Sequence, residues 1–136
     1  GELRYGLLES MTVEKYRLIG LASSRAAFHH AGAVAILGIT QEMLTETSAD
    51  ETDTNGLANM LRAIHPVQVA LVLKESEDGT VRVNIRSKDT FNSAGFATLF
   101  GGGGHARAAG FHLENTTMSD AIAMLAEKAG EWLDQA

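Results

Sequence analysis

Two neighbouring runs of strand length constrain the fold more than any other feature of this sequence. The runs are Val67–Leu73 and Thr80–Ser87, and the tight linker Glu77-Asp78-Gly79 precedes the second one. Asp-Gly between two apolar runs is a strong local signal for a β-hairpin, because both residues tolerate the backbone angles of a tight turn. The sequence therefore predicts an antiparallel pair of strands in the middle of the chain.

The second run also predicts how its side chains divide between the two faces of a sheet. Valine or isoleucine at positions 81, 83 and 85 alternates with Arg82, Asn84 and Arg86. Successive side chains of a strand point to opposite faces. We therefore expect the apolar set to face the core and both arginines to lie together on the opposite face.

Helices and further strands are expected on both sides of this hairpin. Periodicity and capping residues predict helices over Thr12 to about Ser24, Thr40–Glu46, a segment ending near Ile64, Asn92–Phe100, and from Thr117 towards the C-terminus. Short apolar runs predict strands over Val34–Ile39 and Gly110–Glu114. Helices and strands alternate, so we expect an α/β or α+β fold, with a mixed β-sheet flanked by helices in one compact lobe.

Composition narrows the function classes. The chain of 136 residues suits one domain and carries a net charge of −6, which disfavours charge-driven binding to long nucleic acids. It has no cysteine, hence no thiolate metal site, and this composition fits a cytoplasmic protein. One stretch, 85–110, is nonetheless locally basic, with Arg86, Lys88, His105 and Arg107 against the single acid Asp89. A basic patch on an acidic chain predicts a small, defined anion as ligand.

The four glycines at 101–104 lie at the centre of this basic stretch. A helix C-cap followed by a flexible loop is one interpretation, because glycine often ends a helix. One glycine suffices for that purpose, however, and each extra glycine costs roughly 0.5–1 kcal/mol relative to alanine. The interpretation we favour is a phosphate site, in which main-chain N–H groups converge into an anion-binding nest. His105 and Arg107 would add hydrogen bonds, and Arg86, Ser87 and Lys88 would extend the site.

Three motifs together resemble a known family. They are GGGGHARAAGF at 101–111, IRSK at 85–88 and DTNGLANMLRAI at 53–64. In this order they resemble the DHH-associated C-terminal domain of DHH-family phosphoesterases, and most of all its oligoribonuclease and pAp-phosphatase group. That group degrades very short RNAs and 3′-phosphoadenosine 5′-phosphate (pAp). The resemblance covers nearly the whole chain.

The resemblance implies a division of labour between two lobes. An N-terminal lobe holds paired Mn²⁺ ions on aspartates and histidines, and the C-terminal lobe grips the nucleotide and its phosphate. Residues 1–10 would then be a linker from a missing metal-binding lobe, and residues 11–136 the substrate-binding domain. On this view Mn²⁺ is the cofactor of the parent enzyme, its ligands lie outside this chain, and the chain alone binds substrate without hydrolysing it.

The family's binding residues carry over to matching positions of this sequence. The resemblance assigns the phosphate-binding loop to Gly102, Gly103, Gly104 and His105, and the substrate-contacting strand to Arg86 and Ser87 with help from Lys88. Asn59 and Arg62 match the family's GLxNxxR helix and are further candidates. No residue of the chain is expected to be catalytic, although His105 is a candidate for assistance near the scissile phosphate.

One departure from the family pattern supports the fragment interpretation. The Asp-His-His triplet of the metal lobe is absent, and Phe28-His29-His30 is best interpreted as an exposed turn, since phenylalanine binds no metal. Two alternatives stay open. One is the corresponding lobe of a cyclic-dinucleotide phosphodiesterase, and the other is an RNA-binding or dimerisation module of the alanyl-tRNA synthetase C-terminal type. The expected partners are a short RNA or nucleotide, the missing lobe and a second copy in a homodimer, and no membrane.

Overall fold

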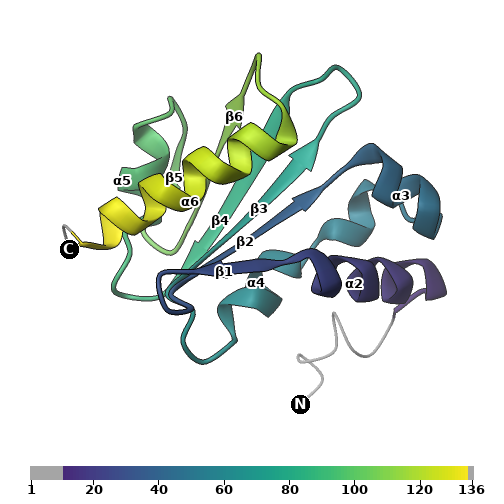
Figure 1. Ribbon diagram of the computed structural model, residues 1–136, viewed down its shortest axis with the longest axis horizontal. Coiled ribbons are helices and arrows are strands. Elements are labelled where there is room, and N and C mark those ends of the chain that lie inside the picture. Colours follow the sequence, from purple (N-terminus) through teal and green to yellow (C-terminus); the bar gives the residue numbers. More distant parts are fainter. Residues whose placement is uncertain (1–10, 135–136) are drawn as a thin grey trace.

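The expected hairpin forms the centre of the β-sheet in the computed structural model, which describes residues 11–134 (Figure 1). The strands are β1 (Ala27–His29), β2 (Val34–Ile39), β3 (Val69–Glu75), β4 (Val81–Ser87), β5 (Gly103–His105) and β6 (Ala108–Leu113). They form one six-stranded sheet in the order β1-β2-β3-β4-β6-β5. Only the pairing of β2 with β3 is parallel, so the mixed sheet expected from the sequence is confirmed.

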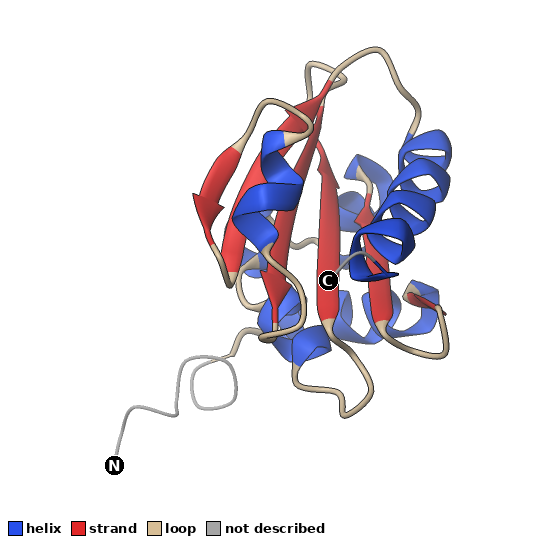
Figure 2. Ribbon diagram, turned by 90° about the vertical axis from the view of Figure 1, so that its left-hand side faces the viewer, coloured by secondary structure: helices blue, strands red, loops and turns tan. Residues whose placement is uncertain are grey.

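Helices cover both faces of this sheet, as Figure 2 shows from the β5 side of the molecule. They are α2 (Val13–Arg25), α3 (Gln41–Thr47), α4 (Leu57–Arg62), α5 (Ser93–Thr98) and α6 (Met118–Asp134), with a 3₁₀ helix, η2 (Glu51–Thr54). Alternating burial along the strands divides the core into two clusters. One lies under α5 and α6 and the other under α2, α3 and α4. The α/β expectation with a single sheet is therefore confirmed.

Side-chain caps fix most helix starts where the sequence predicts them. Thr12, Thr40 and Asn92 each accept a hydrogen bond from a backbone amide in the first turn of α2, α3 and α5. The hydroxyl of Thr117 accepts from the amide of Asp120 at the start of α6. Each cap satisfies an N–H group that has no partner inside its helix.

The helix expected to end near Ile64 is α4, and the acidic stretch that leads into it forms a short element of its own. Asp50 caps η2, and α4 starts after Gly56, whose φ of +89° places it in the left-handed region. A residue in that region interrupts a right-handed helix, so the acidic stretch and the GLxNxxR element become two short elements. No helix among residues 11–134 is long and apolar enough to cross a membrane. The linker expected over residues 1–10 lies outside the described residues.

Candidate functional site: the open face of the sheet

One face of the sheet is bare over its last three strands. The side chains of β4 at positions 81, 83 and 85 belong to the core under α5 and α6, as the alternation predicts. The core cluster under α2, α3 and α4 includes residues of β2 and β3, but no described residue of β4, β5 or β6. Lys74, near the end of β3, pairs with Arg82 and lies on the same side. We call this side of β4, β6 and β5, together with Lys74, the open face.

The strand register arranges the open face in rows, because directly paired residues project on the same side of a sheet. Ala108 pairs with both Arg86 and His105, so these three form one row. Gly110 pairs with both Asn84 and Gly103 and forms the next row. The middle residue of each row, on β6, is alanine or glycine. Because these side chains are small or absent, the surface is shallow at the middle of each row. Arg86 and His105 are thus brought onto one face across a shallow floor.

The first two glycines of the run do not offer free amides to the anion-binding nest that we expected. Gly101 has a φ of +83° and follows α5, and its amide donates to the carbonyl of Thr98. The amide of Gly102 donates to the carbonyl of Ala97. These two N–H groups are therefore used to end α5, as in the helix C-cap interpretation. Gly103 and Gly104 continue as β5, an edge strand rather than a flexible loop.

Two of the glycines are required by close packing of β5 against β6. A Cβ on Gly102 would lie 2.1 Å from the carbonyl oxygen of Gly110. A Cβ on Gly104 would lie 2.6 Å from the Cα of Ala109, and Gly104 also has a φ of +145°. Positive φ and contacts this short exclude any larger residue without a backbone shift.

Gly103 is different, because the fold itself gives no steric reason for a glycine there. A Cβ at this position would meet no atom within 4 Å, and its φ lies outside the left-handed region. Gly103 is exposed and lies beside Gly110 on the open face. Backbone at this position is therefore accessible to a ligand without an intervening side chain.

Arg86 contributes to a small cavity at the border between the open face and α4. The cavity has a volume of about 70 Å³, and it is lined by Thr54, Asn55, Gly56, Ala58, Asn59, Val72, Lys74, Asn84 and Arg86. Arg86 Nη1 donates to the carbonyl of Ile85 at 3.0 Å, which holds the guanidinium while its other N–H groups stay available for an acceptor. The structure thus brings the predicted Asn59 together with Arg86, although they are far apart in the sequence.

A second group of predicted residues lies in a separate hollow at the end of the sheet. Arg62, Lys88 and Arg107 line it, together with Gln68, Ser87, Asp89 and Thr90, and its volume is about 490 Å³. Arg107 Nε forms an ion pair of 3.2 Å with Asp89. Lys88 Nζ donates to the backbone carbonyls of Ile64 and His65 at 3.3 and 3.2 Å. Lys88 and Arg107 therefore already have protein partners.

Ser87 has a structural position that differs from the expected substrate contact. It is 1% exposed, and it continues the buried set of β4 rather than the arginine set. Its hydroxyl is 2.7 Å from the carbonyl of Phe91, 2.7 Å from Ser93 Oγ and 3.2 Å from the carbonyl of Ala106. Ser87 therefore anchors the turn between β5 and β6, and with it the backbone that carries His105.

Four residues of the open face were not singled out as ligands from the sequence: Lys74, Arg82, Asn84 and His112. The alternation along β4 predicted the face on which Arg82 and Asn84 lie, but the long-range pairing that adds Lys74 and His112 has no local signal. Lys74 pairs with Arg82 across β3 and β4. Burial, and then the positive charge of Arg82, lower the pKa of Lys74, while Glu51 opposes the shift.

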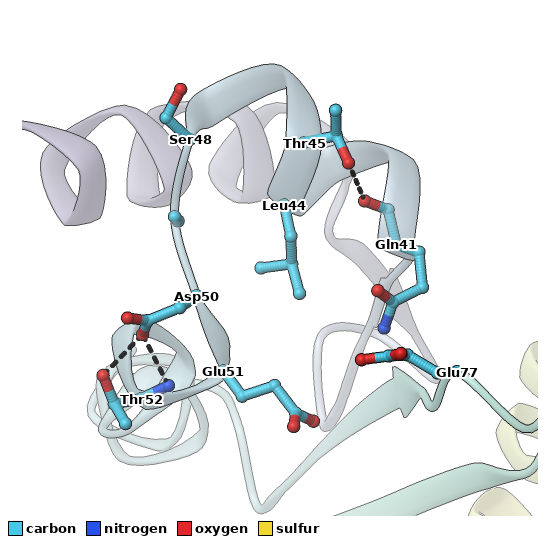
Figure 3. Close-up of a pocket in the computed structure, with 9 residues that line it drawn as sticks. Gln41, Leu44, Thr45, Ser48, Asp50, Glu51, Thr52 and Glu77 are labelled. Atoms are coloured by element: carbon cyan, nitrogen blue, oxygen red, sulfur yellow. Dashed lines mark hydrogen bonds between the residues drawn. The ribbon is translucent and has the colours of Figure 1, made fainter.

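Another hollow of the described surface is acidic (Figure 3). Its volume is about 540 Å³, and Glu51 and Glu77 point towards one another across it. Asp50 at its rim accepts hydrogen bonds from the hydroxyl and amide of Thr52 and from the amide of Asp53. The Thr52 hydroxyl and these amides lower the pKa of Asp50. We call this region the acidic hollow.

The described part of the chain contains no cluster of side chains that could hold a metal ion. Within residues 11–134, no group of three or more histidine, aspartate or glutamate side chains converges. His29 ends β1, and His30 begins the turn to β2 with its Nε2 3.1 Å from the carbonyl of Ala126 on α6. These two histidines therefore belong to an exposed hairpin, and the residues present do not fit a manganese centre.

Comparison with known proteins gives these observations a family. The model of the DHHA1 domain matches residues 32–135. The bifunctional oligoribonuclease and PAP phosphatase NrnA of Thermus thermophilus is 31% identical over 121 residues, which cover 89% of this chain and 36% of that protein. This chain therefore spans about a third of the length of the relative it matches.

Solved structures show the same fold. An exopolyphosphatase-related protein from Bacteroides fragilis superposes with a TM-score of 0.84 at 22% identity, covering 94% of this chain and 37% of that one. A pGpG-specific phosphodiesterase, PggH of Vibrio cholerae, superposes with a TM-score of 0.60 at 12% identity, covering 88% and 40%. Identities this low establish the fold alone. Together with the match over residues 32–135, the fold and the similarity to NrnA show that this chain belongs to the DHHA1 domain family of DHH phosphoesterases.

Proposed function

We propose that this chain is the substrate-binding lobe of a manganese-dependent phosphoesterase that hydrolyses short oligoribonucleotides, 3′-phosphoadenosine 5′-phosphate, or both. The observation that carries the proposal is the open face, where Arg86 and His105 flank a floor of Ala108, Gly110 and Gly103. The similarity to NrnA over 89% of the chain supports the choice of substrate class.

The open face has the chemistry that a nucleotide phosphate needs. Arg86 offers a planar, always charged fork for a phosphate, and His105 adds a ring N–H donor from the opposite side of the row. Gly103 leaves the backbone uncovered in the row next to them, and Asn59 adds an amide at the α4 border. This set neutralises and orients an anion, and positioning of that kind lowers the barrier of phosphoryl transfer.

The hydrolytic step is assigned to another part of the parent enzyme. NrnA is longer than this chain, and we place the manganese ligands in the part of the parent that this chain does not match. Mn²⁺ would supply Lewis-acid chemistry there. The residues of this chain bind and orient substrate, and we expect the chain alone to bind nucleotides without hydrolysing them. The metal lobe and a short RNA are thus its proposed partners.

Ligand titration tests this proposal. The dinucleotide pApA and the mononucleotide pAp would be titrated into the chain, followed by calorimetry and by amide shifts. We expect the amides of Gly103 and His105 to move, and Arg86→Ala to weaken both ligands roughly tenfold, as for a lost charge-assisted hydrogen bond. Arg17→Ala, at an exposed arginine of α2, is the matched control and should change neither affinity. Unchanged binding in Arg86→Ala would refute the proposal.

The same titration separates the alternatives. Selective binding of pGpG over pApA would favour the cyclic-dinucleotide phosphodiesterase group, whose fold the PggH comparison matches. Binding of a structured tRNA acceptor stem in preference to dinucleotides would favour the synthetase type of module. We expect neither preference, because the basic groups of the open face are confined to a few side chains of a chain with a net charge of −6.

A further inference from the structure

The open face contains a second group of basic side chains that the proposed phosphate contacts do not use. Lys74 pairs with Arg82 across β3 and β4, and Arg82 pairs with His112 across β4 and β6. The three side chains therefore form a row on the same face as Arg86 and His105. We call it the cationic row.

This arrangement costs stability unless an anion is bound. Like charges directly opposite each other on neighbouring strands are destabilising. Among the described residues, the ion pairs within 4 Å are Arg107–Asp89 and Lys128–Glu131, and neither involves the cationic row. Lys74 Nζ has a hydroxyl contact with Thr54 at 3.4 Å, and burial and Arg82 both lower its pKa.

The acids nearest to the row are engaged or lie to one side of it. Asp78 and Glu114 line an adjoining hollow with Arg82 and His112. The carboxylate of Asp78 accepts hydrogen bonds from the amide and the hydroxyl of Thr80, at 3.0 and 2.8 Å, and these bonds lower its pKa. Glu51 acts on Lys74 from the η2 side.

A groove connects the cationic row with the glycine floor. Its volume is about 460 Å³, and its lining includes Arg82, Asn84, Gly102, Gly110 and His112. Arg82 Nε lies 3.3 Å from His112 Nε2, which directs the guanidinium across β6 and away from the small cavity that contains Arg86. The two arginines therefore serve different hollows, although they lie on one strand.

The spacing along β4 gives the ligand a minimum length. Arg82 and Arg86 are four residues apart, which corresponds to about 13 Å along an extended strand. This span exceeds the separation of the two phosphates on one ribose, so one nucleotide does not fill both positions. A 5′-phosphorylated chain of three nucleotides does, because two riboses separate its first and third phosphates, with a phosphate at each end of the groove and its sugars above the glycine floor.

We propose that the cationic row of Lys74, Arg82 and His112 is a second anion subsite, which binds a further phosphate of a short linear oligonucleotide whose first phosphate is bound at Arg86 and His105. This inference rests on the proposed function and adds to it a preference for three-nucleotide ligands over dinucleotides and mononucleotides. Asn84, between the two arginines, lies beneath the connecting nucleoside.

A series of ligands of increasing length tests the subsite. AMP, pApA and pApApA would be titrated into wild type, Arg82→Ala, Arg86→Ala and the control Arg17→Ala. We expect affinity to rise with length in wild type, and Arg82→Ala to lose about five- to tenfold for the longest ligand but nothing for AMP. His112→Gln should reduce the same gain. Arg82→Ala removes a like-charge pair, so its melting temperature should not fall.

Each other outcome has a defined meaning. If Arg82→Ala binds all three ligands like wild type while Arg86→Ala weakens them all, the subsite is refuted and the proposed function stands. If Arg82→Ala weakens AMP as much as pApApA, the two arginines form one site and the subsite is again refuted. If Arg86→Ala binds every ligand like wild type, the proposed function itself fails.

Discussion

The acidic hollow and the open face use their charges in opposite ways. In the acidic hollow, Asp50 caps η2, and its carboxylate is satisfied by Thr52 and by backbone amides. On the open face, Lys74 and Arg82 are placed opposite each other with no acid within 4 Å among the described residues. The fold gives the acid a capping role, whereas it gives the cations long hydrogen bonds to Thr54 and His112 and no ion pair among the described residues. The larger hollow is therefore not the better candidate, and unexplained charge is a better guide than volume.

The largest expected effect is the loss of stability on substitution of a packed glycine in the backbone of the open face. Gly102→Ala would place a Cβ 2.1 Å from the carbonyl of Gly110, and we expect it to lower the unfolding free energy by about 1–3 kcal/mol. Gly103→Ala, at the neighbouring position with no contact within 4 Å, should leave stability unchanged or raise it. Denaturant unfolding measures both. Equal losses at the two positions would contradict the distinction between a packed and an exposed glycine.

Measurements of ligand binding test whether the open face, and not the acidic hollow, holds the anion. Arg86→Ala should weaken pApA roughly tenfold, whereas Glu77→Gln in the acidic hollow should leave its affinity within about twofold, because that side chain is exposed and lines a different hollow from Arg86. Calorimetry at one fixed salt concentration gives both values. A larger change from Glu77→Gln than from Arg86→Ala would place the anion site elsewhere.

The effect of Lys74 on the unfolding free energy tests whether the charges of the open face destabilise the free chain. Its pKa is lowered in the folded chain, so its charged form costs folding free energy below that pKa, and the cost vanishes as pH rises to the ordinary value of about 10.4. Lys74→Met should therefore stabilise the free chain at neutral pH by roughly 0.2–1 kcal/mol, the range for like charges across strands. Unfolding measured from pH 7 to 11 should show this gain shrinking, and a variant less stable than wild type at pH 7 would contradict the account.

Asp50 gives the smallest effect and the opposite sign of pH dependence. Hydrogen bonds from Thr52 lower its pKa, so its contribution to stability is present above the ordinary aspartate pKa of about 3.9 and is lost as pH falls through the lowered value. Asp50→Asn should be slightly less stable than wild type near neutrality and equal to it in acid, with unchanged affinity for pApA. A difference that grows as the pH falls would show that the carboxylate is not stabilised in the fold.

Local sequence signals predicted the elements that are marked by helix-capping residues or by alternation of apolar and polar residues. Thr40 and Asn92 cap helices where expected, and the alternation along β4 placed Arg82 and Arg86 on the face away from the core. The same alternation would have placed Ser87 with the buried set, and the resemblance to a substrate-contacting motif concealed this simpler inference. A polar residue in a family motif can thus be structural.

Long-range pairing explains what the sequence did not predict. Glycine has a low strand propensity, so β5 has no local signal and exists because its backbone pairs with β6. His112 joins Arg82 only through the register of β4 and β6, and Asn59 joins Arg86 only through the packing of α4 against the sheet. Motifs therefore predicted individual residues, but the rows of the open face required the fold.

The central claim is that a ligand held by Arg86 and His105 contacts uncovered backbone at Gly103, in the neighbouring row of the open face. Its most direct test is calorimetric titration of Gly103→Ala with pApA, beside an unfolding measurement of the same protein. The account predicts an affinity about five- to tenfold weaker than wild type with no loss of unfolding free energy, because the new methyl group occupies ligand space and touches no protein atom within 4 Å. Wild-type affinity for pApA in a folded Gly103→Ala protein would contradict the claim.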